Sequence, residues 1–249
     1  MAELEQTALT TRRLTWAWLA VFTVTYAASL YTLNFGLPFD HALSELFITR
    51  PCTAKNYYSC WVFDKSNALY TFILHTAPNA LFTFVAVVAA LVFVAGFFKP
   101  RARPYRELSL MLVIGIGGVS GLVSLLKNVT GHYCPAQLAF FGGPVGDVPP
   151  PRPRAACYPA GHPSPGFGLM VLYFSALPLF WRRFGLYAGL GCGSLLGFIQ
   201  IARGEHFLSH NIASALTAVF VGGIVWLINR HLETGLHEAA GSRRRPDDR

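Results

Sequence analysis

Residues 80–98 have the sequence ALFTFVAVVAALVFVAGFF, nineteen residues without one charged side chain. A helix needs about 20 mainly apolar residues to cross the hydrocarbon core of a bilayer. Comparable stretches on both sides of this one predict an all-α, six-helix transmembrane bundle. The expected spans are 14–34, 68–98, 108–126, 165–181, 185–202 and 207–229. In the second span, Pro78 and Asn79 are expected to mark an interfacial turn.

The composition of the whole chain agrees with a membrane protein. Of its 249 residues, 53% are hydrophobic and 13% are charged, whereas ordinary soluble domains carry about 25% charged residues. These values exclude a disordered protein and a small secreted disulfide scaffold. The first apolar stretch is too long for a typical cleaved signal peptide, so we expect it to remain as a span.

The basic residues predict the orientation of the bundle. Of the 20 Lys and Arg residues, thirteen fall on the side of the chain termini and seven on the other. Because cytoplasmic segments are enriched in Lys and Arg, we expect residues 1–13 and the basic tail 230–249 to be cytoplasmic. The transmembrane domain is then 14–229, with outer loops 35–67 and 127–164 facing the periplasm or exterior of a cell (inner) membrane. Topology and anionic lipid explain the net charge of +8, so no nucleic acid partner is expected.

Two of the expected helices carry small residues at four-residue spacing, which lets helices approach closely in lipid. These residues are Gly117 and Gly121 in the third helix and Gly185, Gly189, Gly193 and Gly197 in the fifth. Packing inside the bundle is favoured over homodimerisation, and the oligomeric state is left open.

Titratable residues from three separate segments gather on the expected outer face. They are Lys127, His132, His162, Arg203, His206 and His210. Ionisable groups at membrane helix ends are costly and are typical of functional sites. Cations neutralise a phosphate group, and a neutral imidazole is able to attack phosphorus. The other histidines, His41, His75, His231 and His237, have no such neighbours in the sequence and are interpreted as structural or solvated.

Three motifs in this region resemble those of the type 2 phosphatidic acid phosphatase superfamily, whose pattern is K-x6-R-P, P-S-G-H and S-R-x5-H-x3-D. They correspond to residues 127–135 (KNVTGHYCP), 159–162 (PAGH) and 204–210 (GEHFLSH), and the resemblance extends over roughly 108–229. It implies that His206 attacks phosphorus to give a phosphohistidine and that His162 protonates the leaving oxygen. It also implies that Lys127 binds the phosphate, with no metal or organic cofactor.

The chain departs from this pattern at several positions. Cys134 replaces the first arginine, Ala160 replaces a serine, and Gln200 replaces the arginine of the third motif. Arg203 lies about one helical turn from Gln200 and is expected to supply the missing charge.

The aspartate that orients the nucleophile is also missing, because His210 stands in its place. Either His210 or Glu205 is expected to orient His206. Together with Lys127 and Arg203, His132 and Gln200 complete the expected phosphate-binding set.

Four of the five cysteines fall in the expected outer loops, and an even number in an oxidising compartment predicts two disulfide bonds. Among the three pairings, we favour Cys52–Cys60 and Cys134–Cys157. The second bond would tie the first motif to the second and stabilise the fold by roughly 3 kcal/mol.

The sequence therefore predicts an integral membrane phosphatase that hydrolyses a phosphomonoester or pyrophosphate on a lipid. Three alternatives stay open: a lipid phosphotransferase on the same site, a non-catalytic phospholipid-binding or translocating protein, and a metal-dependent membrane hydrolase. The last would use His132, His162, His206 and His210 as ligands, and the shortage of outer carboxylates argues against it.

Overall fold

The computed structural model describes residues 2–146 and 156–243, with side chains from 15 to 146 and from 156 to 232. In this part of the chain the regular secondary structure is helical, apart from two isolated β-bridges, so the all-α prediction is confirmed. The α-helices are α1 (Ala2–Asn34), α2 (Asp40–Glu45), α3 (Ala68–Thr71), α4 (Ala77–Phe98), α5 (Arg106–Leu112), α6 (Val119–Thr130), α7 (Ser164–Gly168), α8 (Leu179–Ile201) and α9 (Leu208–Arg243). The short 3-10 and π segments are η1 (Phe72–Thr76), η2 (Arg103–Tyr105), η3 (Val113–Gly118), η4 (Pro135–Gln137), η5 (Ala139–Phe141) and η6 (Leu169–Phe174).

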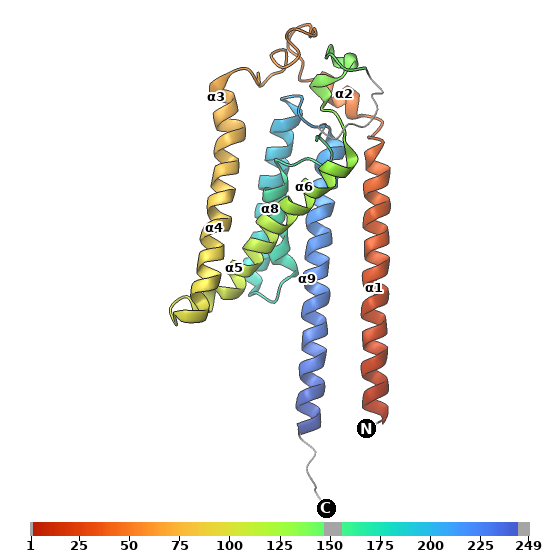
Figure 1. Cartoon of the computed structure of the whole chain (residues 1–249), viewed down its shortest axis with the longest axis vertical. Coiled ribbons are helices and arrows are strands. Elements are labelled where there is room, and N and C mark those ends of the chain that lie inside the picture. The colour runs from red at the N-terminus through yellow and green to blue at the C-terminus, as the bar shows by residue number, and fades with distance from the viewer. Residues whose placement is uncertain (1, 147–155, 244–249) are drawn as a thin grey trace, which may run out of the picture.

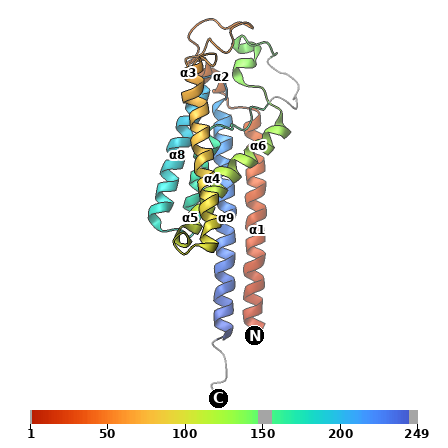
Figure 2. The ribbon, with the colours of Figure 1, turned by 60° about the vertical axis from the view of Figure 1, so that its left-hand side comes forward.

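The long helices run roughly alongside one another, and α6 crosses the bundle at an angle (Figure 1). The long loops gather at one end of the bundle, whereas α1 begins and α9 ends at the opposite end (Figure 2). Helices α1 and α9 lie side by side, joined by stacking of Tyr26 on Phe220 and by a hydrogen bond between Tyr26 and Thr217. The core of the bundle lies between α5–α6, α7–η6 and α9.

Five helical stretches in the described residues are long and apolar enough to cross a membrane. They are Thr15–Asn34, Ala68–Phe98, Arg103–Gln137, Leu179–Ile201 and Leu208–Leu232. The chain is therefore a membrane protein. The orientation of its termini stays a prediction. The count of six spans also stays a prediction, because the remaining apolar helix, Ser164–Phe174, is short.

The predicted extent of the fourth span, 165–181, is wrong. The helix ends at Phe174, and Trp181 belongs to α8. At this break the Ser175 hydroxyl donates to the Leu172 carbonyl, and Pro178 directly precedes α8. Proline lacks an N–H and disfavours the helical conformation of the residue before it, so one apolar run is divided between two helices.

The interfacial turn predicted at Pro78 and Asn79 is also wrong. Segments α3, η1 and α4 follow one another without a break, as one helix with a π-helical turn at Phe72–Thr76. Pro78 occupies the first turn of α4, where a missing N–H is tolerated. Because π turns frequently occur at functional sites, this turn draws attention to His75, which it carries.

The glycines of α8 pack inside the bundle, as the sequence favoured. A Cβ on Gly189 would lie 2.7 Å from the backbone nitrogen of Met170, and one on Gly193 would overlap the Phe167 ring. These glycines therefore let α7 and η6 lie directly against α8. The packing role predicted for Gly117 and Gly121 is wrong, since a Cβ there would meet nothing within 4 Å.

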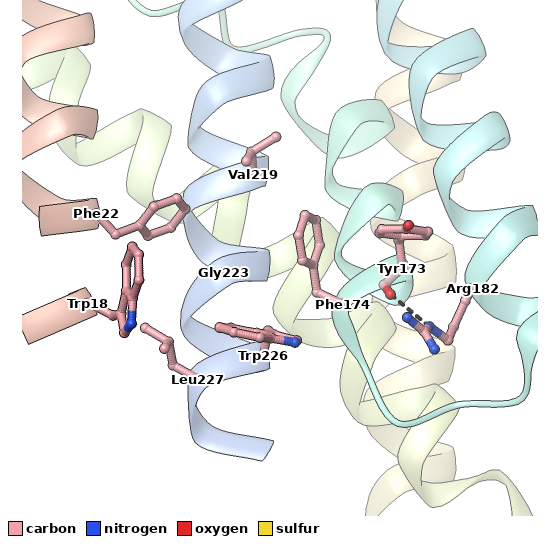
Figure 3. Close-up of a pocket in the computed structure, with 9 residues that line it drawn as sticks. All are labelled: Trp18, Phe22, Tyr173, Phe174, Arg182, Val219, Gly223, Trp226 and Leu227. Carbon is pink, nitrogen blue, oxygen red and sulfur yellow. Dashed lines mark hydrogen bonds between the residues drawn. The ribbon is translucent and has the colours of Figure 1, made fainter. Parts of the chain in front are cut away.

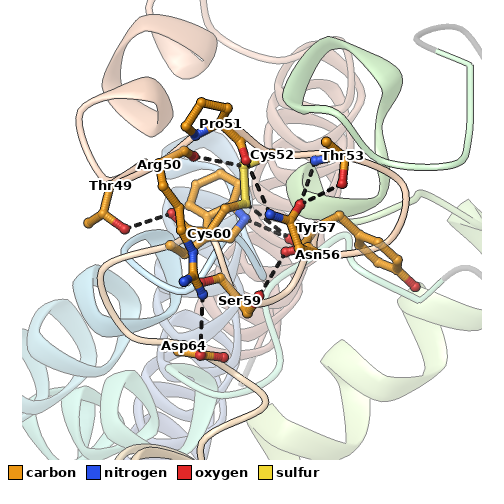
Figure 4. The surroundings of a disulfide bond; sticks show 11 residues. Thr49, Arg50, Pro51, Cys52, Thr53, Asn56, Tyr57, Ser59, Cys60 and Asp64 are labelled. Atoms are coloured by element: carbon orange, nitrogen blue, oxygen red, sulfur yellow. Dashed lines mark hydrogen bonds and ion pairs between the residues drawn. A yellow bond between two sulfur atoms is a disulfide. The ribbon is translucent and has the colours of Figure 1, made fainter.

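The outer loops form a small cap over the end of α8 and the start of α9. Both predicted disulfide pairs are present, with Cα–Cα distances of 5.4 Å for Cys52–Cys60 and 5.2 Å for Cys134–Cys157. Figure 4 shows the first bond among the hydrogen bonds of its loop. Next to it, Trp61 is buried with Phe141 and Phe207 in a separate apolar cluster. The cap thereby joins both loops to the turn that carries the third motif.

Candidate active site

The third motif occupies the tight turn between α8 and α9. The backbone N–H groups of Glu205 and His206 both donate to the Gln200 carbonyl, at 2.9 and 3.3 Å. Gly204 has a φ of +67°, a conformation that favours glycine, and any side chain there would overlap the Trp61 ring. The turn is therefore held by the end of α8 through Gln200 and by the cap through Trp61. These contacts fix the position of His206.

A buried carboxylate, not predicted from the sequence, holds the start of α9. Asp40 is 2% exposed, and its two oxygens accept hydrogen bonds from the backbone N–H groups of Ser209 and Leu37, at 3.1 and 2.8 Å. A carboxylate at a helix N-terminus satisfies free N–H groups and interacts favourably with the helix dipole. This cap comes from α2, about 170 residues earlier, so no local sequence pattern reveals it.

His206 is buried, and its ring lies near the backbone carbonyl of Cys157. The ring of His210 lies near the same carbonyl, and the two ring centroids are 5.9 Å apart. The buried Nδ1 atoms of both rings have no hydrogen-bond partner among the described residues. A backbone carbonyl of the segment that leads into the second motif is thus the polar group beside both rings.

The side chains expected to orient His206 have other partners. The Glu205 carboxylate forms an ion pair with Lys65, at 2.6 Å. The ring of His210 packs against Tyr158, with centroids 5.2 Å apart. In the part of the chain that the structure describes, neither side chain hydrogen-bonds to His206.

Lys127 and His162 lie next to His206. The ring centroids of His162 and His206 are 5.9 Å apart. Lys127 lies in the last turn of α6, and its Nζ lies 2.8 Å from where a Cβ on Gly161 would be. The absence of a side chain at Gly161 therefore gives the lysine amine a place directly beside His162. Among the described residues, the amine has neither a hydrogen-bond nor an ion-pair partner.

Arg203 is almost fully buried, with 1% of its surface exposed. One terminal nitrogen donates to the Thr71 hydroxyl at 3.3 Å, whereas Nε and Nη1 are buried without a hydrogen-bond partner. An unpaired buried charge is costly unless an anion binds to it. The guanidinium thus presents two unused donors in a geometry that suits phosphate oxygens.

The expectation that His75 lies apart from the other histidines is wrong. Its ring lies against His162, with centroids 4.2 Å apart, and its buried Nδ1 has no hydrogen-bond partner in the described residues. Its position within an apolar span was the available sequence indication, because ionisable groups in membrane helices tend to be functional. The site therefore contains a third imidazole, which comes from the π turn.

Gln200 and His132 are the expected site residues that the structure places differently. The Gln200 side chain donates to the Leu74 carbonyl at 3.2 Å, which ties α8 to the π turn. The ring of His132 faces Tyr158, at 5.6 Å between centroids. None of the contacts described for His132 is with His162, His206 or Lys127.

The electrostatics of the cluster keep both central imidazoles neutral at pH 7. Burial, followed by the nearby His75, Lys127, Arg203 and Lys65, lowers the pKa of His162 to about 3. Burial likewise holds the pKa of His206 well below its usual value, with Lys127, His210 and His162 acting in the same direction. The nearby Cys157 carbonyl opposes this shift in the pKa of His206. A neutral His206 has the lone pair that a nucleophile requires.

A metal-ligand set is not formed by the described residues. No group of three or more His, Cys, Asp or Glu side chains within 2–146 and 156–243 has an arrangement that could hold a metal ion. The arrangement instead combines two cations without carboxylate partners, a neutral buried imidazole and a second imidazole beside it. Such a set is able to bind a phosphoryl group and attack it.

Comparison with known proteins agrees with this geometry. No curated protein and no solved structure matches the chain significantly. A family model, the PAP2 superfamily, matches residues 106–233. This match covers more than half of the chain and contains Lys127, His162 and His206. The chain therefore belongs to the PAP2 superfamily, the type 2 phosphatidic acid phosphatases that its motifs resemble.

Proposed function

We propose that this protein is a membrane lipid phosphatase that hydrolyses a phosphomonoester or pyrophosphate through a phosphohistidine on His206. Family membership supports phosphatase activity in general. The lipid substrate, the roles of individual residues and an outward-facing site in the cell (inner) membrane are the proposal.

The phosphate is held by Lys127 and Arg203. The Lys127 amine lies beside Gly161, next to His162, and Arg203 Nε and Nη1 are buried without a hydrogen-bond partner. Bound phosphate supplies the direct ion-pair partner that both cations lack within the described residues. It also raises the pKa of His162, because a nearby anion favours the imidazolium form.

Transfer then takes two steps at phosphorus. The lone-pair nitrogen of His206 attacks and forms a P–N bond while the P–O bond to the lipid breaks, and the leaving oxygen takes a proton from His162. Water next attacks phosphorus, His162 accepts the proton of that water, and the P–N bond breaks to release inorganic phosphate and free His206.

An apolar groove beside the cluster supports a lipid substrate. A cavity of about 420 Å³ lies between α4 and the η3–α6 segment, and it begins at Gly161 and Ser120. Along α4 it is lined from Asn79 to Ala90, a rise of about 16 Å at 1.5 Å per residue. Gly161 thus lies between the Lys127 amine and the groove, and this juxtaposition is the observation that carries the proposal. It supports a substrate whose apolar tail lies in the groove while its phosphate contacts Lys127.

Phosphate release by purified protein tests the proposal. Wild type should release phosphate from long-chain lipid phosphates much faster than from water-soluble phosphate esters, and acid-labile phosphate should accumulate on the protein. His206→Ala should abolish both. His132→Ala, a histidine outside the cluster, is the matched control and should retain most activity.

The same measurements decide between the alternatives. Equal, background release by wild type and His206→Ala would favour a lipid-binding or translocating protein. Labelled phosphate that appears on an added acceptor lipid would identify a phosphotransferase. Loss of activity on chelation would favour the metal-dependent hydrolase.

A further inference from the structure

A second cavity, of about 500 Å³, lies between α1, η6, α8 and α9 (Figure 3). Its walls are mainly aromatic side chains: Trp18, Phe22, Tyr173, Phe174 and Trp226. On α9 the cavity is lined by Val219, Gly223, Trp226 and Leu227, and the Phe22 ring packs directly on Gly223. The cavity is thus a shallow apolar space that crosses α9 between α1 and η6.

This cavity is remote from the histidine cluster. From Leu208 at the start of α9 to Trp226 at the cavity, a helix rises about 27 Å at 1.5 Å per residue. The hydrocarbon core of a bilayer is about 30 Å thick. Trp18 and Trp226 are 62% and 44% exposed, which is typical of tryptophans at a membrane–water interface. The cavity therefore lies at the membrane surface opposite to the proposed active site.

One fixed cation faces this aromatic space. The Nε of Arg182 donates to the Tyr173 carbonyl at 2.9 Å, and the guanidinium carbon lies 5.5 Å from the centre of the Tyr173 ring. Figure 3 shows this hydrogen bond at the edge of the cavity. The terminal nitrogens of Arg182 have no hydrogen-bond or ion-pair partner among the described residues, and no described lining residue is acidic. A guanidinium with two free terminal nitrogens is suited to two oxygens of one phosphate.

We propose that this cavity binds an anionic phospholipid of the leaflet opposite to the active site. The lipid phosphate accepts hydrogen bonds from the terminal nitrogens of Arg182. One acyl chain lies along the exposed faces of Trp226 and Phe174. Bound in this way, the lipid connects α1 to η6 and α8, whereas the main described helix partner of α1 is α9.

The Arg182 charge and the apolar wall contribute separately to binding. Together they favour a complete phospholipid as the ligand. Free phosphate would gain the arginine contacts alone, in a place open to water. A zwitterionic lipid carries the same phosphate and acyl chains, but its ammonium group is repelled by the guanidinium and cancels the attraction at longer range. A lipid with a net negative charge is therefore favoured.

Lipid binding to the full-length protein in detergent tests this inference, with phosphatidylglycerol and phosphatidylcholine as probes. Native mass spectrometry should show phosphatidylglycerol bound at least about tenfold more tightly than phosphatidylcholine, as expected for one charge-assisted contact. Arg182→Gln should remove this preference, and Trp226→Ala, which removes an exposed wall of the cavity, should weaken both lipids. Arg183→Gln, the adjacent exposed arginine, is the matched control and should bind like wild type.

Several results would overturn the inference. Equal loss in Arg182→Gln and Arg183→Gln would indicate general surface charge, and displacement by millimolar inorganic phosphate would indicate an ion site. Loss of the lipid in Lys127→Ala would place it in the active site instead. Failure of the proposed phosphatase activity would leave these binding measurements unaffected.

Discussion

Replacing Gly161 by alanine should weaken catalysis without unfolding the protein. The new Cβ would lie 2.8 Å from Nζ of Lys127 and 3.2 Å from its Cε, whereas ordinary contacts begin at 3.4 Å. The amine must therefore retreat by about 0.6 Å, the difference between 2.8 and 3.4 Å. Only the flexible end of a side chain has to move, so we expect the free energy of unfolding to change by less than about 0.5 kcal/mol.

The expected effect on catalysis follows from the contact between the Lys127 amine and the bound phosphate. A hydrogen bond to a charged group contributes about 1.5–3 kcal/mol, and misplacement of a catalytic contact by about 1 Å can cost about 100-fold in rate. A shift of about 0.6 Å in Lys127 should therefore lower kcat/KM by roughly 10- to 100-fold. Lys127→Ala, which removes the amine altogether, should lower it further.

A double-mutant cycle measured by phosphate release isolates the cause. If Gly161→Ala acts through Lys127, it should have almost no effect on kcat/KM when Lys127 is already alanine. Gly191→Ala is the matched control, because a Cβ at that position of α8 meets nothing within 4 Å. Full activity of Gly161→Ala, or an equal loss in the Lys127→Ala background, would refute the placement of this amine at the phosphate.

Three further predictions concern the surroundings of the nucleophile. In the phosphate-free protein, NMR titration should show that His162 stays neutral down to pH values far below 6.5, because burial and nearby cations lower its pKa to about 3. Added phosphate should raise the midpoint of this titration. A midpoint near 6.5 without phosphate would contradict the prediction. Cys134→Ser should lower the free energy of unfolding by about 3 kcal/mol. It should also reduce phosphate release, because the Cys157 segment beside His206 loses its covalent anchor. Unchanged thermal unfolding and release would argue against this coupling. Glu205→Gln should lower KM by roughly threefold to tenfold. The substitution removes a negative charge that competes with phosphate for Lys127 and Arg203. A raised KM would show that the carboxylate supports phosphate binding instead.

The features that the sequence predicted best depend on composition or on covalent spacing. Long uncharged runs predicted the spanning helices, and cysteine counts in the outer loops predicted both disulfide pairs that the structure contains. The spacing of three motifs predicted that Lys127, His162 and His206 would converge. Each of these patterns is local or is repeated along the chain, so one sequence is enough to recognise it.

The features that were missed depend on backbone conformation or on distant contacts. His75 reaches the site because a π turn and the helix after it run beside the cluster, and an isolated histidine in an apolar stretch does not reveal that neighbour. Asp40 caps a helix that begins far along the chain. Gly117 has the same spacing as a packing residue but lines the groove beside α4 instead. Small residues permit both close packing and open space, and only the arrangement of the helices decides between them.

The substitutions in the motifs form a coherent set when they are considered together. Cys134 takes the place of an arginine, but its disulfide with Cys157 anchors the segment whose backbone carbonyl lies near the His206 ring. Gln200 takes the place of a second arginine and donates to the Leu74 carbonyl in the π turn, while Arg203 donates to Thr71, the residue just before that turn. Relative to the family pattern, the site has one fewer cation, has an imidazole (His210) in place of the aspartate, and gains one disulfide. We therefore infer that this chain relies on a fixed position of the nucleophile to offset a weaker positive field.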